Sequence, residues 1–302
     1  MDFVAIGHIL WETLYDKNGD SQNVLGGPPS YSAVAASKLG ARAGVVTTLG
    51  NDIPKGMIQV FYDSGMDLGG FHITGGYTRT NEFGYDSGGM RRMLSYTRVA
   101  DRITWGHVPG RFLKSKAFFL GPCYFDFGPE FTKKLRGSTD AVICGDMGGL
   151  GGTGRTPDTK PPMVEDPPLL RRYIENYDFL KCSEDDICYA FGAERPDINE
   201  ISLEILGWGP KAILYTKGSR GLDIITKDGA TTVPPCRANA VDPTGAGDCF
   251  TAGFMLSYIK DPDIFKACRF GAAVSACVVE KTGGVTLDRM PYLWEAEKKL
   301  EG

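Results

Sequence analysis

The stretch that decides the fold reads Ala240-Val-Asp-Pro-Thr-Gly-Ala-Gly-Asp-Cys-Phe-Thr-Ala-Gly-Phe254. Asp242-Pro243 is a turn signal that ends an extended run. The segment Gly245-Ala246-Gly247 has too little side chain to cover its own backbone, and from Asp248 on apolar residues recur at helical spacing. The sequence therefore predicts a glycine turn that opens directly into a helix.

Such a turn has a chemical use. The first N–H groups of a helix have no internal partner, and the helix dipole adds positive potential there, so the turn is suited to phosphate. Asp248 places a carboxylate beside this site, where it can accept the proton of an attacking hydroxyl. The alternative is an ordinary helix start with Asp248 as a first-turn residue.

The longer string Asp-Pro-Thr-Gly-Ala-Gly-Asp, residues 242–248, closely resembles the C-terminal signature of the ribokinase-like (PfkB) carbohydrate kinase family. The resemblance implies a three-layer αβα sandwich with a mostly parallel sheet and a small β lid. It also implies Mg²⁺-dependent phosphoryl transfer from ATP, with Asp248 as general base and Gly245, Ala246 and Gly247 as the anion hole. Some relatives have a monovalent-cation site, for K⁺ for example, and Asp242 is the residue expected to contribute to it.

The N-terminal part resembles the same family. Gly26-Gly27 matches the pair that opens a helix lining the sugar pocket. Two positions depart from the family pattern: Tyr31 stands where the family usually has a substrate-binding Asn, and Glu12 stands where it has an Asp. We expect Glu12, Gly26, Gly27 and Tyr31 to bind substrate, and both substitutions bear on which substrate is bound.

Composition excludes several classes of protein. The chain has 302 residues, a net charge of −4 and 42% hydrophobic residues, which is typical of a soluble globular protein without the basic face of a nucleic-acid binder. Its 8 cysteines form no Cys-x-x-Cys pair, which favours reduced thiols in a cytoplasmic protein. The N-terminus shows no signal peptide, and no run is long enough to span a membrane.

Buried strand candidates alternate with helical segments along the chain, which predicts an α/β fold with a parallel sheet. The strand candidates are 3–7, 45–49, 117–120, 141–144 and 212–216. No linker divides two full domains, so we expect a single kinase domain over residues 1–302. The segment 147–168 is rich in Gly and Pro, contains Arg155 and is predicted to be a mobile loop.

Residues 70–105 differ from this pattern. Short β-prone runs at 71–74, 78–85 and 93–97 are separated by glycine turns, which suggests a small antiparallel sheet. By the family resemblance this segment supplies most of a lid over the substrate and often carries a dimer contact. The alternative is an ordinary surface meander.

Two further segments match nucleotide-side positions of the family. Ser183 and Asp186 lie where the family has Asn-x-x-Glu, a motif linked to Mg²⁺ and phosphate, although Ser-x-x-Asp is also a helix cap. The run from Thr216 through Gly218 to Gly221 resembles the Thr-x-Gly-x-x-Gly segment that lines the nucleotide. We expect Ser183, Thr216, Gly218 and Gly221 to bind ATP, and Asp186 to hold Mg²⁺. A plain glycine hairpin is the alternative for the second run.

The sequence as a whole predicts a carbohydrate kinase acting on a small polyol. The departures at Tyr31 and Glu12 disfavour a plain ribokinase or fructokinase, and myo-inositol or a related cyclitol is the candidate acceptor. A nucleoside kinase is the first alternative, because an aromatic residue can stack on a base. A non-catalytic sugar or nucleotide sensor on the same fold is the second, motivated by the substitutions at Ser183 and Asp186.

Overall fold

The computed structural model describes residues 1–15, 19–85, 91–150, 167–191 and 197–301. Most of the loop predicted at 147–168, including Arg155, lies outside the described residues. So does the glycine turn predicted at 87–89.

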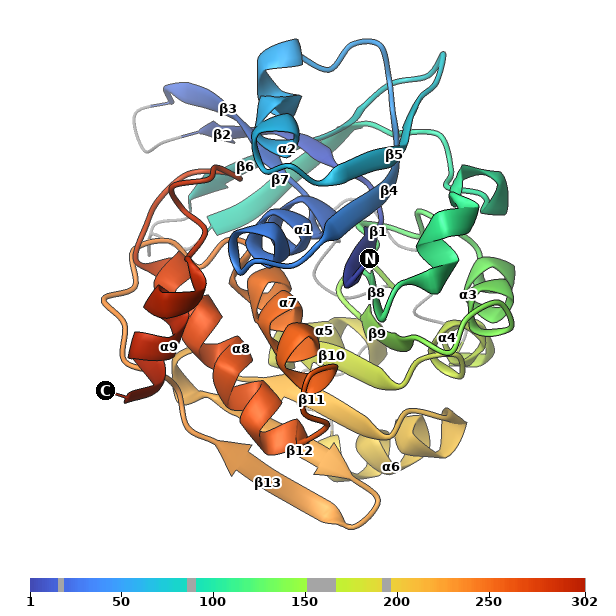
Figure 1. Cartoon of the computed structure of the whole chain (residues 1–302), viewed down its shortest axis with the longest axis vertical. Helices are drawn as coiled ribbons and strands as arrows, with labels where there is room; N and C mark the ends of the chain where they lie inside the picture. The colour runs from blue at the N-terminus through green and yellow to red at the C-terminus, as the bar shows by residue number, and fades with distance from the viewer. Residues whose placement is uncertain (16–18, 86–90, 151–166, 192–196, 302) are drawn as a thin grey trace.

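A nine-stranded sheet forms the middle of the molecule (Figure 1), in the order β13-β12-β11-β10-β9-β8-β1-β4-β5. Neighbours are parallel from β10–β11 through to β4–β5, and only the pairs β11–β12 and β12–β13 are antiparallel. The predicted, mostly parallel sheet is thereby confirmed. The strands are β1 (Phe3–Ile6), β4 (Ala43–Leu49), β5 (Asp67–Ile73), β8 (Ala117–Leu120), β9 (Val142–Asp146), β10 (Phe179–Ser183), β11 (Ala212–Thr216), β12 (Leu222–Thr226) and β13 (Gly229–Val233).

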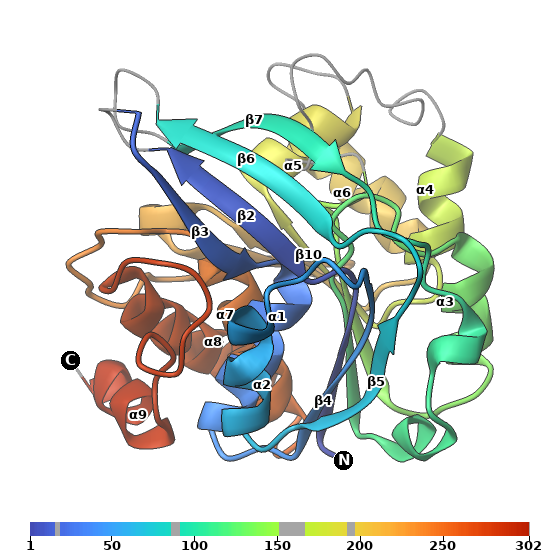
Figure 2. The same ribbon diagram turned by 90° about the horizontal axis from the view of Figure 1, so that it is seen from above.

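Helices cover both faces of this sheet (Figure 2). One face carries α1 (Pro28–Lys38), α2 (Gln59–Asp63), α7 (Ala246–Tyr258), α8 (Ile264–Val279) and α9 (Leu293–Glu301). The other carries α3 (Pro129–Arg136), α4 (Pro167–Ile174), α5 (Glu184–Phe191) and α6 (Ile198–Trp208).

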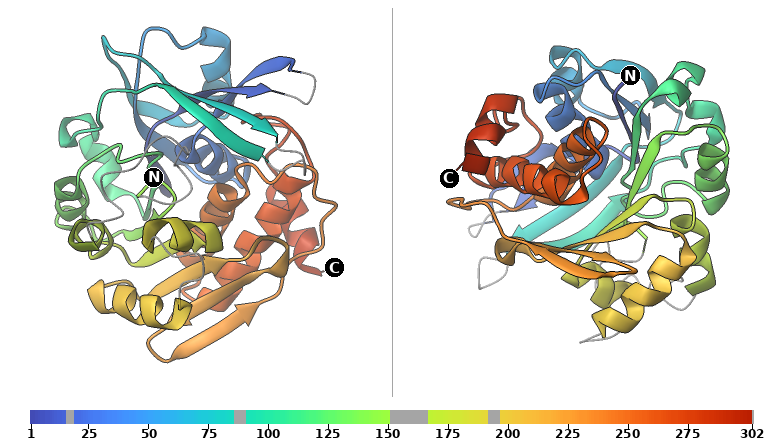
Figure 3. Two further views of the ribbon diagram at one scale, coloured as in Figure 1. Left: turned by 180° about the vertical axis from the view of Figure 1, so that it is seen from behind. Right: turned by 60° about the horizontal axis from the view of Figure 1, so that its bottom comes forward.

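Strand β1 shows why the sheet needs two cores. Phe3 and Ala5 belong to the core beneath α1 and α7, whereas Val4 and Ile6 belong to the opposite core. Because side chains alternate across a strand, a run of consecutive apolar residues must be covered on both faces. The result is the expected three-layer αβα sandwich, and Figure 3 shows α7 and α8 packed side by side in one outer layer.

A second sheet of four strands lies across the carboxyl ends of the main strands (Figure 2), in the order β3-β2-β6-β7. Its members are β2 (Leu10–Tyr15), β3 (Ser21–Gly26), β6 (Arg79–Tyr85) and β7 (Arg91–Arg98). The predicted lid thus exists, but half of its strands come from residues 10–26 instead of 70–105. It is not purely antiparallel, since β2 and β6 run parallel.

The run at 71–74 was assigned to the wrong sheet. Phe71 pairs with Thr47 and Ile73 with Leu49, so this run belongs to β5 at the edge of the main sheet. Its pairing with β4, and not its composition, decides where it lies.

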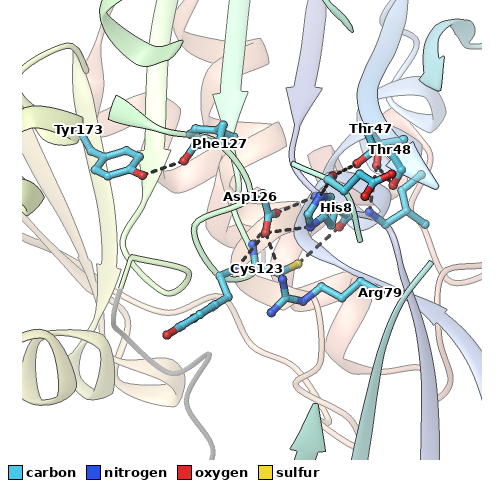
Figure 4. A network of polar contacts seen from close by, with 11 residues as sticks. His8, Thr47, Thr48, Arg79, Cys123, Asp126, Phe127 and Tyr173 are labelled. Carbon is cyan, nitrogen blue, oxygen red and sulfur yellow. Dashed lines mark hydrogen bonds and ion pairs between the residues drawn. The ribbon is translucent and has the colours of Figure 1, made fainter. Parts of the chain in front are cut away.

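A buried polar network joins the lid to the main sheet (Figure 4). Asp126 accepts hydrogen bonds from the backbone N–H groups of His8 and Cys123, each at 2.8 Å. The Nδ1 of His8 lies 3.0 Å from Asp126 Oδ1, and the Nη1 of Arg79, the first residue of β6, lies 3.5 Å from the same oxygen. Burial opposes ionisation of Asp126, but His8, Arg79 and the N–H donors hold the pKa of its carboxyl well below the usual range.

Candidate active site

A cavity of about 480 Å³ lies where the lid faces the carboxyl ends of the main strands. This is where open α/β sheets bind ligands, and the size is that of a small-molecule site. It is lined by lid residues, strand ends and the loop before α7: Leu10, Glu12, Gly27, Pro28, Tyr31, Asn81, Phe83, Pro122, Cys123, Asp146, Gly148, Gly149, Lys181, Asp186, Pro243, Thr244, Gly245, Gly247 and Asp248.

The predicted glycine turn opens α7 at the edge of this cavity. Gly245 caps the helix in the left-handed conformation, with φ 74°. A Cβ there would also lie 2.2 Å from the Tyr31 ring, so both conformation and space require glycine. Among the described residues, the N–H groups of Gly245, Gly247 and Asp248 have no hydrogen-bond acceptor. The turn therefore offers N–H donors to an anion in the cavity.

Ala246 differs from its predicted role. Its N–H donates to the Pro243 carbonyl at 3.1 Å, closing a turn, and Ala246 is absent from the residues that line the cavity. In the described part of the chain, the third N–H group of the turn without an acceptor is that of Asp248.

Asp248 lies in the first turn of α7 and reaches the cavity. Desolvation in the cleft raises its pKa, and the nearby Asp146 carboxylate raises it further. The ammonium group of Lys181 opposes both effects, and the resulting pKa is about 8. A carboxyl group poised in this range is suited to proton transfer near neutral pH.

Lys181 is the cation at the centre of the site. It lies on β10 with its Nζ 2.9 Å from Asp146 Oδ2 and 4.0 Å from Asp186 Oδ2. Burial works against its charge, but Asp146, Asp186 and Asp248 outweigh burial and raise the Lys181 pKa above its ordinary value. Gly247 leaves room for this side chain, because a Cβ there would lie 3.0 Å from Nζ.

Ser183 and Asp186 form a reciprocal cap at the start of α5. The Ser183 N–H donates to Asp186 Oδ2 at 2.8 Å, and the Asp186 N–H donates to Ser183 Oγ at 3.1 Å. Asp186 lines the cavity, whereas Ser183 does not. The structure therefore shows the helix cap, and Asp186 also lines the cavity.

The predicted substrate residues are brought together from two layers. Glu12 on β2 and Tyr31 in the first turns of α1 are both buried and line the cavity. Gly26 makes room for the Glu12 carboxylate, since a Cβ there would lie 2.3 Å from it, although Gly26 itself is not among the lining residues. Gly27 caps α1 with φ 93°, so the helix begins at Pro28.

Thr216, Gly218 and Gly221 are not among the residues that line the cavity. Thr216 pairs with Ser183 across β10 and β11, which brings these two predicted nucleotide residues side by side. Gly218 and Gly221 both have positive φ, at 56° and 85°. A Cβ at Gly221 would meet the Val233 carbonyl at 2.3 Å, whereas Gly218 faces open space.

Asp242 lies behind the glycine turn and outside the cavity lining. Its Oδ1 accepts the Thr244 N–H at 2.9 Å, and its Oδ2 accepts the Gly283 N–H at 3.3 Å. The same Oδ2 lies 3.4 Å from Nη2 of Arg289, a side chain that is 1% exposed.

Four polar residues described above are absent from the site that the sequence predicts. Lys181 sits within an apolar strand and Asn81 in a lid strand, where no local motif marks them. Asp146 was visible only as a carboxylate at a strand end. Arg289 lies in the connection between α8 and α9, and pattern reasoning gave it no role.

Two absences concern only the described part of the chain. No group of three or more His, Cys, Asp or Glu residues there is arranged to hold a metal ion. None of the helices in the described ranges is long and apolar enough to cross a bilayer.

The chain is similar in sequence to known kinases. A family model for pfkB family carbohydrate kinases matches residues 149–289. A cytidine kinase of Thermococcus kodakarensis is 26% identical over 287 residues, covering 94% of this chain and 98% of that protein. A nucleoside kinase of Methanocaldococcus jannaschii is 47% identical over 134 residues, covering 44% of this chain and 42% of that protein.

Solved structures share the fold. A fructokinase of Xylella fastidiosa with bound ATP superimposes with a TM-score of 0.81 at 20% identity, over 99% of this chain and 98% of that one. Another solved protein of this fold holds ATP and Mg²⁺. With the glycine turn, the lid and the sandwich in place, the chain has the ribokinase-like fold, its residues 149–289 match the PfkB family of carbohydrate kinases, and the protein is a phosphotransferase with an alcohol group as acceptor.

Proposed function

We propose that this kinase transfers the γ-phosphoryl group of ATP to a hydroxyl of a nucleoside, with Asp248 as general base. The observation that carries the proposal is that Asp248 and the N–H groups of Gly245 and Gly247 share one cavity with polar lid residues. The groups suited to phosphate transfer and those suited to binding the acceptor therefore line the same cavity.

Each protein group has a definite task in the proposed reaction. The acceptor oxygen attacks the γ-phosphorus, its proton passes to the Asp248 carboxylate, and the bond to the ADP oxygen breaks. The free N–H groups of the glycine turn stabilise the charge on the transferring group. Because the base form of Asp248 is needed and its pKa is about 8, we expect kcat/KM to rise with pH up to that region.

The carboxylates at the cavity fit a magnesium ion. Asp146 and Asp186 offer oxygen ligands, and Mg²⁺ usually keeps several waters and takes only one or two protein carboxylates. Asp186 is the residue we propose for this role, acting through water because its Oδ2 already accepts the Ser183 N–H. The ion would neutralise charge on the phosphates.

Ser183, Thr216, Gly218 and Gly221 are proposed to bind the nucleotide. Their support is the pairing of Ser183 with Thr216 and the open space at Gly218, both at the carboxyl end of the sheet. Lys181 would then lie between the nucleotide phosphates and Asp248, as a fixed positive charge in the cavity.

Asn81 and Glu12 are the polar groups on the acceptor side. Asn81 is 3% exposed, lines the cavity and has no hydrogen-bond partner for Oδ1 among the described residues. An unsatisfied buried amide is costly unless a ligand satisfies it, so we propose that Asn81 bonds the acceptor. In this proposal Asn81 binds the acceptor in place of the Asn that the family usually has at the position of Tyr31.

A nucleoside is preferred over the cyclitol that the sequence alone favoured. Tyr31 and Phe83 supply aromatic surface in the cavity, which suits a base. The similarity to a cytidine kinase along nearly the whole chain supports the same choice. The cyclitol stays as the alternative, since Glu12 and Asn81 would also bind ring hydroxyls.

Three wider expectations are kept as proposals. We propose that residues 1–302 form one kinase domain. The eight cysteines are free thiols, which supports a reducing, cytoplasmic location. A homodimer through the lid is supported by its edge strands β3 and β7, which can pair with another chain, and light scattering on the purified protein tests it.

The test is an acceptor panel with ATP and Mg²⁺, in which ADP formation is followed for cytidine, adenosine, myo-inositol, ribose and fructose. Asp248→Asn serves as the matched blank. We expect a nucleoside to give the highest kcat/KM by about tenfold or more, because a bound base fills the aromatic wall. A higher value for myo-inositol or a sugar would overturn the nucleoside assignment. ATP binding without ADP formation on any acceptor would overturn the kinase in favour of a sensor.

A further inference from the structure

Oxygen atoms converge on the buried guanidinium of Arg289. Its Nη2 donates to the carbonyls of Asp242, at 3.1 Å, and Thr244, at 2.8 Å. Its Nη1 donates to the Gly283 carbonyl and lies 3.4 Å from the Tyr31 hydroxyl. With Asp242 Oδ2 at 3.4 Å, one carboxylate, one hydroxyl and three carbonyl oxygens surround a single positive charge.

This is the ligand set that an alkali cation takes. Such ions are held by backbone carbonyls and carboxylate oxygens that replace their hydration shell. The family resemblance implies that Asp242 contributes to such a site in some relatives. In the structure the guanidinium already uses the Asp242 carboxylate and the neighbouring carbonyls, so the residues present do not fit an added K⁺ ion.

The oxygens that Arg289 holds belong to the catalytic loop. Asp242 and Thr244 immediately precede Gly245, whose N–H faces the proposed phosphate site. Carbonyls drawn toward the guanidinium fix the peptide planes that lead into the turn. A cation–π contact also links Arg289 to the turn. The guanidinium carbon lies 5.6 Å from the centre of the Tyr31 ring, and that ring packs on Gly245.

We propose that Arg289 is a built-in replacement for a bound monovalent cation, and that this kinase therefore works without K⁺. A guanidinium keeps its charge at every accessible pH, so the loop stays ordered whatever the salt composition. Arg289 is a positioning residue in this account, since it acts through the loop and touches no reacting atom.

The test compares salts and variants. Wild-type kcat should agree within about twofold in KCl and in tetramethylammonium chloride at equal ionic strength, because no ion site is open. Arg289→Ala should lose roughly 10–100-fold of kcat in tetramethylammonium, since a displaced loop misaligns the phosphate site. K⁺ or methylguanidinium should restore at least part of that loss, which a merely structural role would not produce.

Melting temperature gives a second readout that needs no substrate. It separates this inference from the proposed function on which the kinetic arm rests. The Tm of the wild type should be the same in both salts, whereas the Tm of Arg289→Ala should be lower and should rise in K⁺. Arg79→Ala is the matched control: Arg79 is equally buried beside an aspartate, and K⁺ should not restore its Tm.

Several results would overturn the inference. One is wild-type activity or Tm that depends strongly on K⁺. Another is a folded Arg289→Ala protein that neither K⁺ nor methylguanidinium improves, or one that behaves like wild type in both salts. If Arg289→Ala does not fold, the wild-type comparison and Arg289→Lys, which keeps a charge, still decide the question.

Discussion

Two fully buried arginines hold two different regions together. Arg79 and Arg289 are each 1% exposed, each has an aspartate partner, and each lies over a tyrosine ring, at 5.7 Å and 5.6 Å. At the lid junction, Arg79 faces the Asp126 carboxylate together with His8 (Figure 4). Behind the glycine turn, Arg289 is held mostly by backbone carbonyls.

The difference separates stability from function. At the lid junction, charges compensate each other inside the protein, so their loss should appear first as lost stability. Behind the turn, the Arg289 guanidinium positions the carbonyls of the loop that leads to the phosphate site. Loss of this side chain should therefore lower kcat before it lowers stability. Three variants test this contrast, and two of them have a matched control.

Asp126→Asn should give the largest loss of stability. It leaves Arg79 buried without its carboxylate, which costs about 3–5 kcal/mol of unfolding free energy. The pKa of Asp126 is lowered in the folded protein, so its contribution is present above the ordinary carboxyl pKa and is lost as pH falls below it. Urea unfolding should therefore show a wild-type advantage at pH 7 that shrinks toward pH 3.

Asp242→Asn is the control at the other arginine. Its carboxyl is more exposed, and the carbonyls continue to hold Arg289, so we expect a smaller loss of stability. Equal losses in both variants, or an Asp126 effect that does not change with pH, would contradict the contrast.

Gly245→Ala should cost roughly 2 kcal/mol of stability and also lower kcat, because φ 74° is unfavourable for alanine and the new methyl group meets the Tyr31 ring. Gly40→Ala is its control, since Gly40 has φ 91° and open space around it. That variant should lose about 1 kcal/mol without a kinetic effect. Thermal unfolding and steady-state assays measure both, and equal kcat losses would argue against a special role for the turn.

Tyr31→Phe should have the smallest effect. It keeps the ring over Gly245 and removes the hydroxyl, which lies 3.4 Å from Nη1 of Arg289, a contact worth about 1 kcal/mol or less. We expect a kcat within a few-fold of wild type in potassium-free buffer. A large loss in this assay would mean that the hydroxyl, and not the carbonyl set, controls the arginine.

The main sheet and the glycine turn were predictable because their signals are local. Apolar runs ending in Gly or Asp mark β1 and β9, and the segment around Gly245 and Asp248 carries its own spacing. The lid was only half predictable. Strand β2 pairs with β3 and also with β6, which lies far along the chain, and nothing local shows that second pairing.

The buried cations were the hardest part of the site to foresee. Lys181 occurs in an apolar strand and Arg289 in a polar connection, and each acquires meaning only from oxygens brought in by other elements. The N–H of Ala246 donates to the Pro243 carbonyl, a turn hydrogen bond that the spacing of the motif does not reveal. Such pairings depend on tertiary structure, which periodicity and spacing do not report.

The most direct test of the whole account is the turnover of Asp248→Asn on the best acceptor from the panel. We expect a kcat lower by about 10²–10⁴, because the base is lost while the N–H donors remain. ATP should raise the melting temperature of this variant and of the wild type alike. An Asp248→Asn protein with full turnover would contradict the proposed mechanism.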